Sequence, residues 1–231
     1  MTTPPPAVVV TGARVMHPSG VVAEDLHVVG DRLVAAPGGR DAHVVDAEGA
    51  SVVPLLFESA IAQLPPGERD RFDLVPGNPA TFAVVRRRVT ESQVHRMLVV
   101  DPGDLLAVYV AGHLEAHDGE PTRPAGEDLT DPAVRATWAG TWHDSGRALQ
   151  QHLRPDGRYS ETRGGRADAY TGRYWVREDR ITYLDDSGFW AFGQLVGDVL
   201  HHAGFVMSRR RSLPGSTRSW LGGAATRTVE P

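Results

Sequence analysis

The chain of 231 residues contains no cysteine. Disulfides, thiolate zinc sites and cysteine nucleophiles are therefore all excluded as sources of stability or chemistry. The absence carries no information about the redox compartment, because a chain without thiols suits either one.

Clustered basic residues and long apolar runs are also missing. The formal net charge is −5, and no segment gathers the lysines and arginines that phosphate binding needs, so we expect no nucleic-acid partner. No apolar run approaches the roughly 20 residues of a membrane span, which predicts that no membrane is involved. The first residues, MTTPPP, lack the basic start of a signal peptide, so we expect a cytoplasmic protein.

Turn-forming residues are abundant, with 17 prolines and 25 glycines. They separate short valine-rich runs, and helical periodicity is hard to find, which predicts a mainly β fold. In the N-terminal part we expect strands at 8–10, 26–29, 33–35, 44–46, 82–86, 98–100 and 108–110.

A polar stretch at 116–131, rich in Pro, Gly, Asp and Glu, favours a domain boundary. Asp131 and Pro132 within it are typical of the start of a short helix, which we expect to run through Val134. The predicted segments are an N-terminal unit, a linker, a second unit and a flexible tail, at 7–118, 119–137, 138–211 and 212–231.

Aromatic residues become frequent in the second unit and alternate with polar ones. Short turns link the successive strands, so an antiparallel meander is the simplest topology, and closing it into a barrel removes the exposed edges. The expected strands lie at 140–143, 148–153, 158–163, 170–177, 180–185, 189–195 and 200–209.

The N-terminal unit resembles the opening of amidohydrolases, where such segments form half of a small β-sandwich beside a metal-bearing barrel. Later segments resemble the strands that complete that sandwich. The segments that carry the resemblance are 9–15 (VVTGARV), 24–34, 45–54, 75–85 and 105–112. The resemblance implies an amidohydrolase composite β-sandwich at 7–118.

The chain departs from that family where the chemistry would be. In place of the histidine pair that supplies metal ligands, residues 57–62 read FESAIA, with alanine at both histidine positions. Only residues 55–74 separate the two halves, so the catalytic barrel is absent. We therefore predict no amidohydrolase activity, no metal and no cofactor. A structural or dimerising module is expected, with a ligand site of its own as the alternative.

The second unit has strands similar to those of avidin and streptavidin at 139–146 and 170–174. It is more similar to a family of functionally uncharacterised bacterial barrels with a streptavidin-like or lipocalin-like fold, first defined from an agrobacterial protein. The motifs that carry this resemblance are LRPDGRYSETR (153–163), YTGRY (170–174), ITYLDDSGFWA (181–191) and LHHAG (200–204). The resemblance implies the fold and a ligand cavity, and no reaction.

Alternate side chains along a strand share a face, which places Tyr159, Glu161 and Arg163 on one side. We predict that this side faces the barrel interior. A carboxylate and a guanidinium there are costly unless they are paired or face a ligand. The alternative is a cross-strand ion pair on the solvent face.

The candidate catalytic residues are Glu161, Asp185 and His202. The candidate ligand-binding residues are Trp142, Asp144, Tyr159, Arg163, Tyr174, Tyr183 and His201. Because neighbours along a strand point to opposite faces, at most one of the two adjacent histidines lines the cavity, and the sequence does not choose between them. The structural alternatives are that Trp142 belongs to the core, that Asp185 only shapes a turn, and that an inward histidine is only hydrogen-bonded.

Three functions compete. The first is binding of a small organic molecule, an aromatic or polycyclic metabolite. The second is a cofactor-independent isomerase, cyclase or lyase of biosynthesis, with Glu161, Asp185 or a histidine as general base and with Arg163 and a tyrosine stabilising negative charge. The third is a structural or dimerisation module without a ligand. Whether the chain forms a homodimer stays open.

Overall fold

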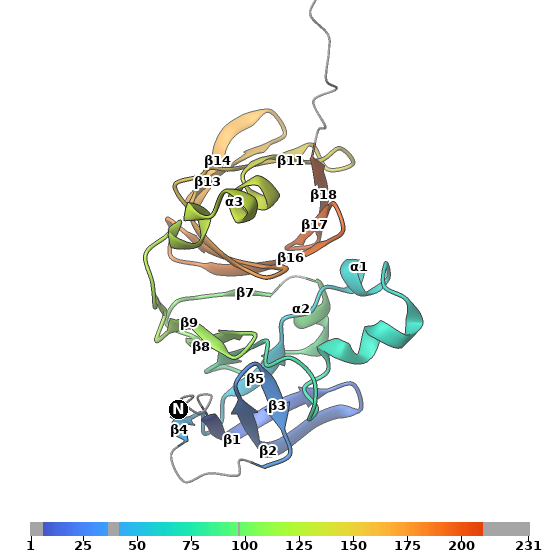
Figure 1. Ribbon diagram of the computed structural model, residues 1–231, viewed down its shortest axis with the longest axis vertical. Coiled ribbons are helices and arrows are strands. Elements are labelled where there is room, and N and C mark those ends of the chain that lie inside the picture. The colour runs from blue at the N-terminus through green and yellow to red at the C-terminus, as the bar shows by residue number, and fades with distance from the viewer. Residues whose placement is uncertain (1–6, 37–41, 97, 210–231) are drawn as a thin grey trace, which may run out of the picture.

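The computed structural model describes residues 7–36, 42–96 and 98–209. The fold is mainly β, with an N-terminal sheet and a closed antiparallel barrel, as predicted. The barrel has eight strands, one more than the seven expected. Figure 1 shows the sheet below and the barrel above it. The predicted tail at 212–231 lies outside the described residues.

The N-terminal sheet has the strand order β10-β9-β8-β6-β5-β1-β2-β3, with β4 parallel to β1. Its strands are β1 (Ala7–His17), β2 (Gly20–Val29), β3 (Arg32–Val34), β4 (His43–Asp46), β5 (Ser51–Pro54), β6 (Phe82–Val85), β8 (Leu105–Val110), β9 (His113–His117) and β10 (Glu120–Pro121). No strand was expected at β5, β9 or β10. Between β5 and β8 lie α1 (Glu58–Ile61), η1 (Pro66–Phe72), α2 (Glu91–Arg96) and β7 (Val99–Val100).

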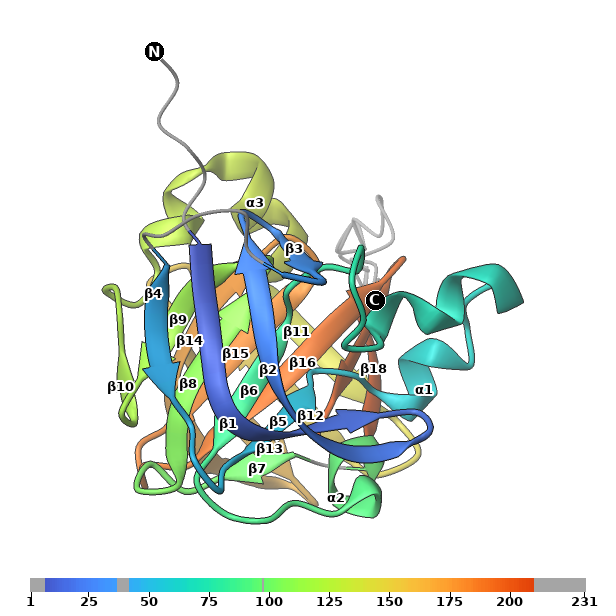
Figure 2. The ribbon, with the colours of Figure 1, turned by 90° about the horizontal axis from the view of Figure 1, so that it is seen from below.

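Strand β1 bends midway, and this bend folds the sheet over its own core (Figure 2). The register with β2 shifts between Val10 and Ala13, and Gly12 within the shift has a φ of 70°. A glycine in the left-handed region is the usual residue of such a bulge, which increases the local twist. Before the bend β1 pairs with β4, and after it β1 pairs with β5.

The middle strands of the sheet are buried on both faces. In β6, Phe82 and Val84 pack into the core enclosed by the folded sheet, whereas Ala83 and Val85 pack into a second core. This explains the uninterrupted apolar run of β6, since a strand covered on both sides does not alternate with polar residues.

The barrel covers the second face of the sheet. The second core contains four residues of the barrel's outer wall, namely Trp175, Leu184, Trp190 and Phe192. Strand β7 also crosses to the barrel, where Val100 pairs with Trp190. The two units therefore share one apolar core.

The barrel is an up-and-down meander in which the last strand pairs with the first. Its strands are β11 (Gly140–Asp144), β12 (Leu149–Leu153), β13 (Arg158–Arg163), β14 (Arg166–Arg177), β15 (Arg180–Asp185), β16 (Trp190–Val196), β17 (Val199–His202) and β18 (Phe205–Arg209).

The prediction of a single last strand at 200–209 is wrong, because the chain turns there and forms the hairpin of β17 and β18. Ala203 and Gly204 form the turn with φ values of 47° and 77°. Two left-handed residues suit a two-residue hairpin turn, whose twist matches that of the strands. Alanine rarely occupies this region, so residue preferences did not reveal the turn.

Residues 119–137, which were predicted to be a linker, fold against the barrel. They contain η2 (Glu127–Thr130) and most of α3 (Pro132–Trp138), which is longer than predicted. Leu129 and Trp138 enter the barrel core, and Trp138 accepts a hydrogen bond at its carbonyl oxygen from Trp142 Nε1 at 3.0 Å. Helix α3 thus closes one end of the barrel.

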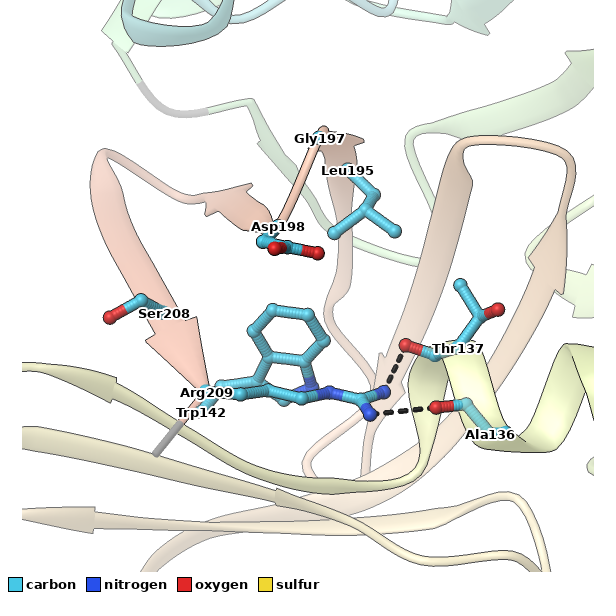
Figure 3. A pocket seen from close by; sticks show the side chains of 8 residues that line it. All are labelled: Ala136, Thr137, Trp142, Leu195, Gly197, Asp198, Ser208 and Arg209. Atoms are coloured by element: carbon cyan, nitrogen blue, oxygen red, sulfur yellow. Dashed lines mark hydrogen bonds between the residues drawn. The ribbon is translucent and has the colours of Figure 1, made fainter. Parts of the chain in front are cut away.

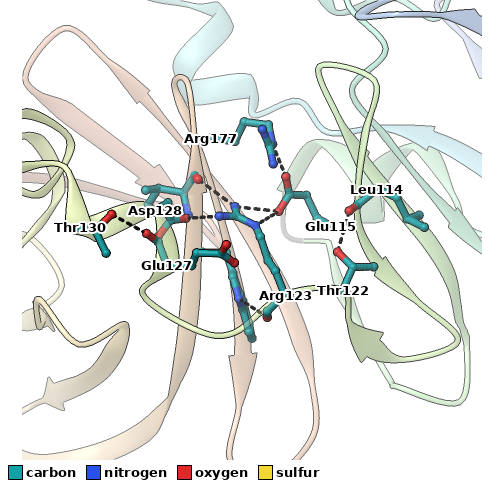
Figure 4. Close-up of polar contacts among 10 residues, drawn as sticks. Leu114, Glu115, Thr122, Arg123, Glu127, Asp128, Thr130 and Arg177 are labelled. Atoms are coloured by element: carbon teal, nitrogen blue, oxygen red, sulfur yellow. Dashed lines mark hydrogen bonds and ion pairs between the residues drawn. The ribbon is translucent and has the colours of Figure 1, made fainter. Parts of the chain in front are cut away.

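A buried ion network joins the sheet, the connecting segment and the barrel (Figure 4). Glu115 of β9 accepts hydrogen bonds from Arg123 Nε and Nη2 at 3.1 and 2.9 Å, and from Arg177 of β14. Arg123 also contacts Asp128 at 3.0 Å, and Asp128 accepts from the backbone of Val176. The network fixes how the barrel sits on the sheet.

Glu115→Ala should destabilise the protein by about 3 kcal/mol, because it leaves Arg177 partly buried without its carboxylate and Arg123 paired with Asp128 alone. Urea unfolding measures the change. Glu120→Ala, at an exposed position on the neighbouring strand, is the control and should change stability by less than about 0.5 kcal/mol. Equal stability of the two variants would show that the network does not hold the units together.

Candidate functional site

The end of the barrel opposite α3 holds a pocket of about 350 Å³. Its lining comes from β13, the start of β14, the loop between β15 and β16, the end of β17, and β7 of the N-terminal unit. The lining residues are Val99, Tyr159, Glu161, Arg163, Tyr170, Asp185, Ser187, Phe189, Ala191, His202 and Ala203.

A polar layer lies below the pocket. Tyr183 donates a hydrogen bond to Gln151 Oε1 at 2.7 Å, and Gln151 Nε2 donates to Glu161 Oε1 at 3.0 Å. Between this layer and α3 the interior is packed with large side chains, among them Trp142 and Tyr174. These large side chains separate the pocket from the α3 end of the barrel.

Glu161 and Arg163 form an ion pair on the pocket wall. Glu161 is 2% exposed, and its Oε2 accepts from Arg163 Nε at 2.8 Å and lies 2.7 Å from Nη2. The Arg163 side chain is 38% exposed, with its guanidinium over the ring of Tyr170 at 4.3 Å. The carboxylate is thus inside, as the alternation of β13 predicts, and not on the solvent face.

His202 lies beside the same carboxylate. Its Nδ1 is 3.0 Å from the carbonyl oxygen of Phe192, which can only accept, so Nδ1 carries a proton. Its Nε2 lies 3.7 Å from Glu161 Oε1. Burial lowers the pKa of His202, although Glu161 acts in the opposite direction. A neutral ring therefore presents the Nε2 lone pair, which can accept a proton.

Asp185 both shapes a turn and faces the pocket. Its Oδ1 accepts from the backbone N–H of Ser187 at 2.8 Å, which is the turn role. Its Oδ2 accepts from the Tyr159 hydroxyl at 3.2 Å. Burial raises the pKa of Tyr159 well above its ordinary value, and the charge of Asp185 adds to this shift, so the phenol stays protonated.

The structure brings five of the ten candidate residues to the pocket lining: Tyr159, Glu161, Arg163, Asp185 and His202. Tyr183 lies in the polar layer below. The other four lie outside this pocket.

Those four have structural contacts. Trp142 lies in the barrel core. Asp144 accepts from the backbone of Arg147 and Val206 in a turn. Tyr174 donates to the carbonyl oxygen of Arg154. His201 points away from the interior, and its Nδ1 lies 2.9 Å from Ser59 Oγ, so the two histidines face opposite sides as expected.

Two aromatic residues at the rim were missed. Tyr170 and Phe189 line the pocket with 46% and 44% of their surface exposed. Each stands at the start of an expected strand, next to a turn that contains glycine. That position is the signal by which the sequence could have revealed them. Val99 of β7 was also missed, and no local pattern reveals that contact.

A larger hollow of about 650 Å³ lies at the α3 end (Figure 3). There the guanidinium of Arg209 lies 4.7 Å from the Trp142 ring and donates to the carbonyl oxygens of Ala136 and Thr137. An arginine that satisfies the last carbonyls of a helix acts as a cap. The guanidinium in this hollow therefore has a structural role, which is to hold the end of α3.

In the part of the chain that the structure describes, no group of three or more His, Cys, Asp or Glu side chains is placed to hold a metal ion. No helix among the described residues combines the length and the apolar character that crossing a bilayer requires.

His202 should make the protein sensitive to acid. Its folded pKa lies below the unfolded value near 6.5, so the unfolded state takes up the proton first. The contribution of His202 to the free energy of unfolding is therefore fully present above about pH 6.5 and is lost as the pH falls below that value. We expect His202→Asn to reduce the slope of the unfolding free energy between pH 7 and 5.5 by up to about 1.4 kcal/mol per pH unit. The exposed His113→Asn is the control, and an unchanged slope in His202→Asn would contradict the assignment.

The sequence of the barrel matches a known family. Residues 135–209 match the family described as Agrobacterium tumefaciens protein Atu4866. The solution structure of the protein Atu4866 from Agrobacterium tumefaciens is 44% identical over 32% of this chain and 95% of that chain, with a TM-score of 0.30. No curated protein matches the chain. Through its barrel, at residues 135–209, the chain belongs to the Atu4866 family.

Proposed function

We propose that the chain binds a small organic molecule in the open half of its barrel. The observation that carries the proposal is the ion pair between the buried Glu161 and the partly exposed Arg163, which lies on the wall of a pocket with exposed aromatic residues at its rim. A mostly apolar hollow with a few convergent polar groups is the usual composition of a small-molecule site.

The rim indicates the class of ligand. Tyr170 and Phe189 expose large apolar rings to water, and a ligand that covers them gains hydrophobic and ring-stacking contacts. The floor offers hydrogen-bonding groups from Tyr159, Asp185 and His202. An aromatic or polycyclic metabolite with one or two polar substituents fits a pocket with an apolar rim and a polar floor.

The architecture supports the same proposal. We regard the barrel as streptavidin-like or lipocalin-like, since barrels of eight up-and-down strands have interiors that can hold one small ligand. Here α3 closes one end and leaves the other accessible.

We further propose that the N-terminal unit is an amidohydrolase-like β-sandwich that lacks the metal ligands and the catalytic barrel of that family. The FESAIA segment, where that family holds metal, forms α1, and its Ala60 packs into the core shared with the barrel. The unit supports the barrel wall in this interpretation.

A second candidate function is acid/base catalysis, favoured by the position of His202. A neutral imidazole in the pocket lining, with its Nε2 at 3.7 Å from Glu161 Oε1, is suited to remove a proton from a bound molecule. Arg163 is placed to stabilise the negative charge that develops, whereas the proton of the Tyr159 hydroxyl is already donated to Asp185. The matching reactions are cofactor-independent isomerisation, cyclisation or elimination of a biosynthetic intermediate.

Binding can be tested with N-phenyl-1-naphthylamine, a neutral polycyclic fluorophore. We expect saturable binding by fluorescence, weakened about tenfold by Phe189→Ser, because the variant loses an aromatic contact at the rim. Val21→Ser, an equally exposed apolar residue of the N-terminal sheet, should bind as the wild type does. Absence of saturable binding would favour a structural or dimerisation role without a ligand.

Proton abstraction can be tested with 5-nitrobenzisoxazole. The base removes the proton from carbon 3 while the ring N–O bond breaks, which yields a cyanophenolate that absorbs visible light. We expect the wild type to accelerate the reaction and His202→Asn to reduce kcat/KM by about 10²-fold, with fluorophore binding within about threefold of wild type. Equal rates in both proteins would contradict the catalytic role.

A further inference from the structure

A second hollow, of about 580 Å³, adjoins the pocket at the barrel rim. One wall comes from the N-terminal unit and the other from the barrel. The lining residues are Phe57, Glu58, Ser59 and His95 on the first wall and Arg147, Arg163, Ala203, Gly204 and Phe205 on the second.

The two hollows meet at Arg163 and Ala203, which belong to both linings. Arg163 uses its Nε and Nη2 to bind Glu161. It also lies over Tyr170 and, at 5.1 Å, over Phe205. Its position is therefore fixed at the boundary between the two spaces.

Arg147 brings a second positive charge to this place. Its Nη1 donates to the carbonyl oxygen of Gly204 at 2.7 Å, and its guanidinium lies 5.3 Å from the ring of Phe205. Among the described residues it forms no ion pair. Phe205 thus has a guanidinium against it from Arg147 and another from Arg163, and the charge of Arg147 is available to an anion.

The wall from the N-terminal unit is anchored at several points. The hydrogen bond between Ser59 and His201 attaches α1 to β17. Arg180 of the barrel donates to the carbonyl oxygen of Leu55, and β7 pairs with β16. The second hollow is therefore a fixed feature of the folded chain.

We propose that the ligand carries an anionic group, held in the second hollow by Arg147 and Arg163, while its aromatic body occupies the barrel pocket. This inference rests on the proposed binding function. It makes the N-terminal unit part of the binding site, with Glu58 as the carboxylate that opposes the anion from the far wall. The class of ligand is an aromatic or polycyclic carboxylate, sulfonate or phosphate.

The test compares two fluorophores with similar aromatic bodies. 8-Anilinonaphthalene-1-sulfonate carries an anion, and N-phenyl-1-naphthylamine does not. We expect Arg147→Gln to weaken binding of the sulfonate about fivefold and to leave binding of the neutral probe within twofold. Arg135→Gln, an exposed arginine on α3 at the opposite end of the barrel, should change neither.

Glu58→Gln tests the contribution of the N-terminal unit, and its expected effect on binding is opposite to that of Arg147→Gln. Removing this carboxylate should strengthen binding of the sulfonate at least twofold at low salt, without effect on the neutral probe. Added salt should reduce the difference.

The outcomes separate this inference from the proposed function. Binding of the neutral probe with no response of the sulfonate to Arg147→Gln overturns the anion site and leaves the barrel pocket as proposed. A sulfonate that responds to Arg147→Gln but not to Glu58→Gln overturns the part assigned to the N-terminal unit. Failure of both probes to bind overturns both proposals.

Discussion

The rest of the structure depends on the apolar second face of the N-terminal sheet. Strands β5, β6 and β8 have one face in the core of the folded sheet. The other face is also apolar and is buried only when another element packs against it. The outer wall of the barrel supplies it with Trp175, Trp190 and their neighbours. Because this contact is apolar and continuous, the two units form one body, and the ion network around Glu115 fixes their orientation.

That packing positions the candidate site. With the barrel wall on the sheet, α1 and β7 lie beside the open end of the barrel, where Val99 and Ser59 reach the two hollows. Helix α3 covers the opposite end. The polar layer of Gln151, Tyr183 and Glu161 separates the pocket from the large side chains packed toward α3, so the pocket lies where both units contribute to its walls.

The sequence predicted which face of a strand each side chain lies on. It predicted less well how far along the barrel a side chain lies and which distant segments it contacts. A period of two placed Tyr159 and Glu161 inside and His201 opposite His202. The same period cannot tell the two ends of a barrel apart, so Tyr174 was assigned to a cavity although it lies in the packed half. The hairpin at Ala203 was missed because its turn breaks residue preferences. The contacts of Val99 and Ser59 with the barrel join residues far apart in the chain, and no local pattern reveals them.

The ion pair on the pocket wall is hard to explain by stability alone. Taking the Glu161 carboxylate out of water costs several kcal/mol, and a partner that is itself partly exposed, as Arg163 is, offsets that cost only in part. A structural role would be served as well by two apolar side chains, like those that fill the α3 half of the same barrel. Glu161, however, has its charge balanced by Arg163 and lies beside the Nε2 of His202, and all three line an accessible hollow. Under the proposed binding function, charges at this place would recognise a polar group on the ligand.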